Sequence, residues 1–181
     1  MTATPRRWLP PFWLVIILFF LFYGSLSVGL KMACGLPWSA PLPVIPALAI
    51  GVLLLAFGFG MYAWSIKSLT VRRAFGKELF KTAAESTLVT AGAYAHSRNP
   101  IYFSVTLLLL GWFCVSRWTP LGILTVLAFI HFMLVAKWEE KELTARFGET
   151  YLDYKARTPF FIPGLRRKSN QFTRQKRVQD P

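Results

Sequence analysis

Two polar segments of this 181-residue chain could do chemistry, and each adjoins a long apolar run. The first covers residues 86–102 and reads STLVTAGAYAHSRNPIY. Because Pro100 disfavours helical backbone at Asn99, the sequence predicts a helix that starts at or just after the proline. The unpaired amides of that helix's first turn, beside Arg98 and Asn99, would suit a carboxylate or another polar ligand group.

The second segment covers residues 138–163, WEEKELTARFGETYLDYKARTPFFIP, and continues the last apolar run. On a helix, Glu140 shares a stripe with Leu143 and Phe147, so this carboxylate is predicted to face protein, with Glu139 beside it. Adjacent acids at the edge of a membrane are costly unless a cation or hydrogen-bond donors compensate them. The pair is therefore a candidate for ligand binding or catalysis.

Structural interpretations of these residues stay open beside the chemical ones. Arg98 could simply reach lipid head groups, with Tyr94 and Tyr102 in an interfacial aromatic belt. His131 lies inside the last apolar run, where an ionisable residue is a functional candidate. A neutral imidazole bonded to the backbone of a neighbouring helix would fit that position as well.

The composition indicates that a bilayer is the solvent. With 54% hydrophobic residues and only eight acidic ones, a soluble domain of this size would have too little polar surface to cover its core. The net charge of +13 falls in blocks between apolar runs, which favours anionic lipid head groups and not nucleic acid as partners. The sequence has no Cys/His cluster with metal-ligand spacing, so no metal site is expected.

These properties predict an all-α polytopic membrane protein with about four transmembrane helices plus short interfacial helices at the cytoplasmic face. A proline-rich loop precedes the second span, and Gly148 is expected to end the helix that continues the fourth. The predicted spans are Trp8–Leu30, a helix from about Ala47 to Trp64, Ile101–Ser116 and Thr119–Ala136.

The distribution of cations predicts the orientation. Of the 21 Lys and Arg residues, only Lys31 and Arg117 fall outside the N-terminal segment, the 65–100 connection and the region after residue 136. The positive-inside rule then places both termini in the cytoplasm, in a bacterial inner membrane or an endoplasmic-reticulum-type membrane. The first span is expected to be retained, because its apolar run is longer than a signal-peptide core.

Taken together, LVTAGAYAHSRNPIY, an apolar hairpin and EEKELTARFGETYLDYKARTPFFIP resemble the isoprenylcysteine carboxyl methyltransferase and phospholipid methyltransferase superfamily of integral-membrane enzymes. The resemblance covers about residues 86–163. It implies a methyltransferase core over 66–163 with its hairpin at 101–136. The apolar runs predict two generic transmembrane helices over 1–65, and the composition predicts a basic disordered tail over 164–181. That tail would contact anionic lipids or serve only as a topology anchor.

The resemblance implies an S-adenosylmethionine-dependent methyltransferase with its cofactor at the cytoplasmic face and a lipophilic acceptor that enters from the bilayer. Arg98 and Glu140 are then predicted as catalytic residues. The predicted cofactor-binding residues are Ser86, Thr87, Leu88, Val89, Tyr94, Asn99, Pro100, Ile101, Tyr102 and Glu139.

Two positions depart from the pattern of the superfamily. Asn99 stands where His is usual, and an amide cannot act as a general base near neutral pH. Val135 stands where the carboxyl methyltransferases resemble one another in having Arg, which leaves the acceptor open among an isoprenylcysteine-type carboxylate, a phospholipid head group and another lipid. The alternative to an enzyme is a small membrane protein such as a transporter subunit or an assembly factor, in which His131 and the acidic pair would line a pathway. The sequence leaves the oligomeric state open.

Overall fold

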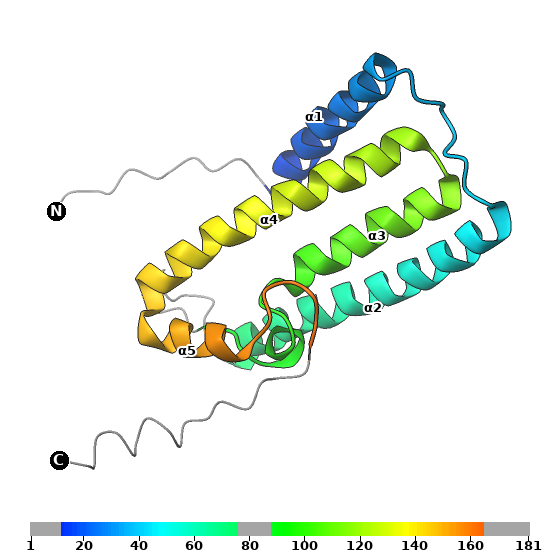
Figure 1. The fold of residues 1–181 in the computed structure, drawn as a ribbon. Coiled ribbons are helices and arrows are strands. Elements are labelled where there is room, and N and C mark those ends of the chain that lie inside the picture. Colours follow the sequence, from blue (N-terminus) through cyan, green and yellow to red (C-terminus); the bar gives the residue numbers. More distant parts are fainter. Residues whose placement is uncertain (1–11, 76–87, 165–181) are drawn as a thin grey trace, which may run out of the picture.

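The computed structural model describes residues 12–75 and 88–164 (Figure 1). Ser86, Thr87, the N-terminal cations and the basic tail from residue 165 onward lie outside these ranges. The described residues form α-helices and one short 3-10 helix, with no strand, which confirms the all-α class. The elements are α1 Phe12–Ala33, α2 Val44–Phe75, η3 Gly92–Ala95, α3 Pro100–Ser116, α4 Thr119–Phe147 and α5 Glu149–Arg157.

The helix boundaries follow from local signals in the sequence. Helix α2 begins at Val44 because Pro46 lies in the first turn, where a helix needs no N–H donor. It continues to Phe75, well past the predicted end at Trp64, because the residues after the apolar run allow a longer helix. Helix α4 ends as expected at Gly148, which has a φ of +53°.

Within the part of the chain that the structure describes, two helices are long and apolar enough to cross a bilayer, over Val44–Leu69 and Thr119–Phe147. Only 22% and 28% of their most apolar windows are buried, so these helices are not the core of a soluble domain. Ile45 and Leu53 on α2, for example, are 81% and 70% exposed. Such surfaces suit contact with lipid and indicate a membrane protein. The apolar helices Ile17–Ala33 and Pro100–Ser116 are shorter.

Helix α3 lies between α2 and α4, and α1 packs on α4 (Figure 1). The contact between α2 and α3 is the most extensive, and small residues bring the two backbones together there. A Cβ atom on Gly51 would lie 2.7 Å from Val115 Cγ2 and 2.9 Å from the carbonyl oxygen of Gly111. Glycine at this position therefore sets the distance between α2 and α3.

We expect Gly51→Val to destabilise the protein by about 1–3 kcal/mol, because the added side chain must push α2 away from α3. Gly60→Val is the matched control: it lies in the same helix, and a Cβ atom there meets nothing within 4 Å. Unfolding of both variants in mild detergent would give the difference. Equal stability of the two variants would contradict the proposed close packing.

The turn between α3 and α4 confirms the predicted tight hairpin. Arg117 adopts left-handed backbone with a φ of 54°, and its carbonyl oxygen accepts a hydrogen bond of 2.7 Å from the Ala40 amide. The loop between α1 and α2, which contains Ala40, also holds Trp38, whose ring centre lies 3.8 Å from the Lys31 ammonium group. Lys31 and Arg117, the two cations apart from the charged blocks, thus lie at one end of the helices.

Candidate active site

The opposite end of the helices gathers the polar residues singled out in the sequence. Four segments meet there: the connector before α3, which is residues 88–99, the last turns of α4, helix α5 and residues 158–164 (Figure 1). The adjacent acids Glu139 and Glu140 point to different partners. Because the two carboxylates leave α4 in different directions, the polar residues at this end form two clusters.

Glu140 forms the first cluster with two cations. Its Oε1 atom lies 2.8 Å from Arg98 Nη1 and its Oε2 atom lies 2.9 Å from Lys155 Nζ. The Arg98 and Glu140 side chains are only 10% and 11% exposed, whereas Lys155 is 43% exposed. As the helical stripe predicts, Glu140 faces protein, and two cations compensate its charge.

The geometry of the Arg98 guanidinium leaves hydrogen-bonding capacity unused. Nη1 lies within ion-pair distance of Glu140 but is not aligned for a hydrogen bond. Within the described ranges, the buried Nε atom has no hydrogen-bond partner either. The guanidinium also lies 5.4 Å from the centre of the Phe160 ring. A buried hydrogen-bond donor without a partner is costly, so Arg98 is suited to donate a hydrogen bond to an oxygen atom of a ligand.

Glu139 forms the second cluster with α3. The Tyr102 hydroxyl donates a hydrogen bond of 2.8 Å to Glu139 Oε1, and both side chains are half-buried. The Tyr102 ring stacks on Phe132 of α4, with ring centres 5.2 Å apart. This pair ties the start of α3 to the end of α4 and leaves one carboxylate oxygen for another donor.

Residues 158–164 fold back over the connector before α3. The Arg98 amide donates to the Pro159 carbonyl at 2.9 Å, and Asn99 Nδ2 donates to the Phe160 carbonyl at 2.8 Å. The Ser97 hydroxyl adds a bond of 2.7 Å to the Phe161 carbonyl. These bonds cover the connector with the end of the described chain. Asn99, predicted to contact the cofactor, therefore uses its amide nitrogen to hold this cover.

Helix α5 places two buried tyrosines against the connector and the Glu140 cluster. The Tyr154 hydroxyl donates a hydrogen bond of 2.7 Å to the Tyr94 carbonyl oxygen. Burial raises the pKa of Tyr151 to about 12, and the negative charge of Glu140 adds to the effect. Burial also raises the pKa of Tyr154. Both phenols therefore stay protonated further into the alkaline range than an exposed tyrosine, and Tyr154 acts as a hydrogen-bond donor.

The structure brings together part of the predicted set. Arg98 meets Glu140 directly, and Tyr102 meets Glu139. The other predicted residues that it describes lie along the connector and the first turn of α3: Leu88, Val89, Tyr94, Asn99, Pro100 and Ile101. Sequence reasoning missed Lys155 and Phe160, because their partners lie 15 and 61 residues away in the chain. The motif over residues 138–163 pointed to this region without assigning a role to either residue.

His131 joins α1 to α4. Its Nδ1 atom lies 2.9 Å from the Tyr23 hydroxyl, and its ring packs against Phe19 at 5.2 Å between centres. The imidazole is thus bonded to a neighbouring helix, as the structural interpretation expects, although through a side chain and not through the backbone. This contact attaches α1 to the rest of the bundle.

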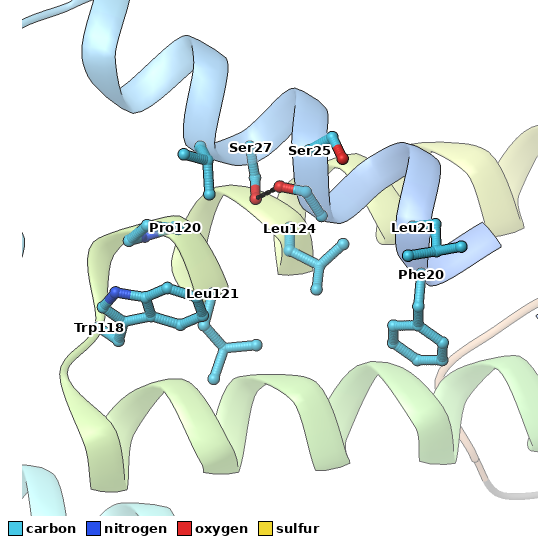
Figure 2. Close-up of a pocket in the computed structure, with 10 residues that line it drawn as sticks. Phe20, Leu21, Ser25, Ser27, Trp118, Pro120, Leu121 and Leu124 are labelled. Atoms are coloured by element: carbon cyan, nitrogen blue, oxygen red, sulfur yellow. Dashed lines mark hydrogen bonds between the residues drawn. The ribbon is translucent and has the colours of Figure 1, made fainter. Parts of the chain in front are cut away.

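An apolar cavity of about 520 Å³ lies between α1 and α4 near the other end of the helices (Figure 2). Phe20, Leu21 and Leu124 line it, and the hydroxyl of Ser27 is bonded to the Gly24 carbonyl at 2.8 Å. Leu124 is roughly 22 Å along α4 from Glu139 at 1.5 Å per residue. The cavity is therefore separate from both polar clusters.

Comparisons with known proteins agree with the motifs. A family model described as phospholipid methyltransferase matches residues 46–150, from the start of α2 to the start of α5. The methanethiol S-methyltransferase of Crocosphaera subtropica is 33% identical over 85 residues, which cover 44% of this chain and 31% of that protein.

Two vertebrate proteins named protein-S-isoprenylcysteine O-methyltransferase also match. The mouse protein is 34% identical over 88 residues, covering 44% of this chain and 29% of the relative. The Xenopus laevis protein is 30% identical over 127 residues, covering 65% and 41%. The chain thus spans less than half the length of these relatives, and no solved structure matches it significantly. The match over residues 46–150 confirms the resemblance seen in the motifs, and the chain belongs to the phospholipid methyltransferase family.

Proposed function

We propose that the protein is an integral-membrane, S-adenosylmethionine-dependent methyltransferase that acts on a lipophilic acceptor. The observation that carries the proposal is the pair of polar clusters around Glu139 and Arg98, beside a connector that residues 158–164 cover, in a chain of this family. The cofactor, when bound, supplies a methyl group on a sulfonium.

The residues present fit such a cofactor. The free carboxylate oxygen of Glu139 would accept hydrogen bonds from ribose hydroxyls or from an ammonium group. The unpartnered Nε atom of Arg98 would donate to a carboxylate. Tyr94 and Tyr102 offer aromatic faces, which attract a sulfonium or stack with adenine.

Methyl transfer from a sulfonium needs little acid–base work. Positive charge is dispersed as the methyl group moves in line, so an enzyme gains chiefly by orienting donor and acceptor and excluding water. The hydrogen bonds between residues 96–99 and 158–164 would exclude water at this end. The small number of ionisable residues suits this chemistry.

We further propose that α1, α2, α3 and α4 all cross the membrane, with both termini in the cytoplasm. Among the described residues, two cations, Lys31 and Arg117, lie at one end of the helices, and a cluster lies at the other, with Arg98, Lys137, Lys141 and Lys155; this supports the orientation. A reporter enzyme that works only in the cytoplasm should therefore be active when it is fused to the C-terminus. Activity of a periplasmic or lumenal reporter at the same position would show the opposite orientation and would contradict the proposed access of the cofactor.

The acceptor proposal rests on Val135, which lies one turn before Glu139. Arg98 is paired with Glu140, and its remaining donor, Nε, is assigned to the carboxylate of the cofactor, so neither position is left to bind a carboxylate acceptor. We propose an acceptor with an apolar tail and a neutral or amine nucleophile, such as a lipid head group. A farnesyl-cysteine analogue should then be methylated at least about tenfold less efficiently than a preferred lipid, because one charge-assisted bond is missing.

Radiolabelled methyl transfer to both substrate types, with membrane lipids and with the analogue, tests the acceptor. Val135→Arg should raise methylation of the analogue, because it introduces the missing cation. Efficient carboxyl methylation by the unmodified protein, lost in Arg98→Ala or Lys137→Ala, would contradict the proposal.

A further inference from the structure

We propose that a cationic pocket between the end of α4 and helix α5, beside the Arg98–Glu140 cluster and apart from the Tyr102–Glu139 pair, binds the phosphate of an anionic phospholipid. The pocket has a volume of about 610 Å³. Its lining residues are Lys137, Glu140, Lys141, Thr144, Ala145 and Lys155.

The pocket carries an excess of positive charge. Lys137 and Lys141 lie one turn apart on α4, and Lys155 joins them from α5. The one carboxylate in the lining, Glu140, is already engaged at both oxygens by Arg98 and Lys155. Among the described residues, Lys137 and Lys141 have no acidic partner. Like charges at i and i+4 destabilise a helix, so a bound anion would relieve a repulsion.

The chemistry of the lining suits a phosphate attached to an apolar molecule. Lysine ammonium groups bind phosphate as point charges, and their long stems leave apolar walls. Ala145 extends these walls. The Thr144 hydroxyl donates to the Glu140 carbonyl oxygen at 2.7 Å, so specificity would come from charge and not from this hydroxyl.

The depth of the pocket favours a lipid as the source of the phosphate. Trp138 directly follows Lys137 and is 60% exposed, and Leu134 one turn earlier is 63% exposed. An exposed tryptophan at the end of an apolar helical surface is typical of the head-group level of a bilayer. Lysines at that level are attracted to anionic lipid head groups.

The pocket lies apart from the Tyr102–Glu139 pair. On α4, Lys137, Lys141 and Thr144 fall on one flank of Glu140, whereas Glu139 falls on the other. A phosphate bound in the pocket would touch Lys155, which joins α5 to Glu140, and would not touch the Tyr102–Glu139 pair. A bound phosphate would therefore help to keep α5, and the cover that follows it, against α4.

The full-length chain in mild detergent, titrated with dioleoylphosphatidylglycerol and followed by native mass spectrometry, tests the site. The variant Lys137→Ser with Lys141→Ser should bind this lipid at least about tenfold more weakly than the unmodified protein. The matched control, Lys67→Ser with Arg157→Ser, removes two cations outside the pocket and should stay within about threefold. Dioleoylphosphatidylcholine should bind all three proteins alike. The readout needs no methyl transfer, so its failure would leave the proposed function untouched.

Two results would overturn the proposal. Equal affinity of the pocket variant and the unmodified protein for dioleoylphosphatidylglycerol would remove the lysines from any lipid site. Inorganic phosphate that binds the unmodified protein as tightly as the lipid does, with the same loss in the pocket variant, would assign the pocket to a soluble phosphate compound.

Discussion

Glu140→Ala is expected to destabilise the protein more than any other single change at the candidate site, by about 3–5 kcal/mol. The reason is the burial of its partner: the Arg98 side chain is only 10% exposed and would stay in place without a counter-charge. Lys155 is 43% exposed and could turn toward water, so it adds less to the loss. Equilibrium unfolding in mild detergent gives the free energy difference.

The double variant Arg98→Met with Glu140→Met separates charge from packing. Replacing both buried charges with apolar side chains of similar length should recover most of the lost stability. Glu142→Ala is the matched control, because Glu142 lies on the same helix, is exposed and should change stability by less than about 0.5 kcal/mol. A Glu140→Ala variant as stable as Glu142→Ala would show that the Arg98–Glu140 pair does not hold the connector to α4.

Glu139→Gln is expected to weaken binding of S-adenosylhomocysteine by roughly tenfold to a hundredfold, the cost of one charge-assisted hydrogen bond. The glutamine carbonyl would still accept the hydrogen bond from Tyr102, so the contact between α3 and α4 should survive. Calorimetric titration measures the affinity. Glu142→Gln removes the same charge from an exposed position and should leave the affinity unchanged.

Unchanged affinity in Glu139→Gln would remove Glu139 from the cofactor site. Tyr102→Phe then tests whether the hydrogen bond between Tyr102 and Glu139 has a structural role. It should loosen the link between α3 and α4 by about 1 kcal/mol, because a half-buried hydrogen bond is lost.

The sequence predicted the features that depend on local pattern. The α3–α4 hairpin follows from two apolar runs separated by Arg117 and Trp118, and the end of α4 follows from Gly148. The inward direction of Glu140 follows from its spacing to Leu143 and Phe147. In each case, residues close in the chain contain the whole signal.

Features that depend on distant pairing were not predictable from the sequence. Lys155 could have been a surface lysine, and nothing near Asn99 pointed to the Phe160 carbonyl as its partner. The separate directions of Glu139 and Glu140 also depend on which neighbouring helix lies on each side. The end of α2 at Phe75 was missed because the apolar run stops before the helix does.

Calorimetric titration of the purified protein with S-adenosylhomocysteine shows whether the chain binds the product form of the proposed methyl donor. We expect saturable binding at one site per chain, weakened in Glu139→Gln and unchanged in Glu142→Gln. A folded, monodisperse protein that binds no S-adenosylhomocysteine would contradict the claim that this chain is an S-adenosylmethionine-dependent methyltransferase.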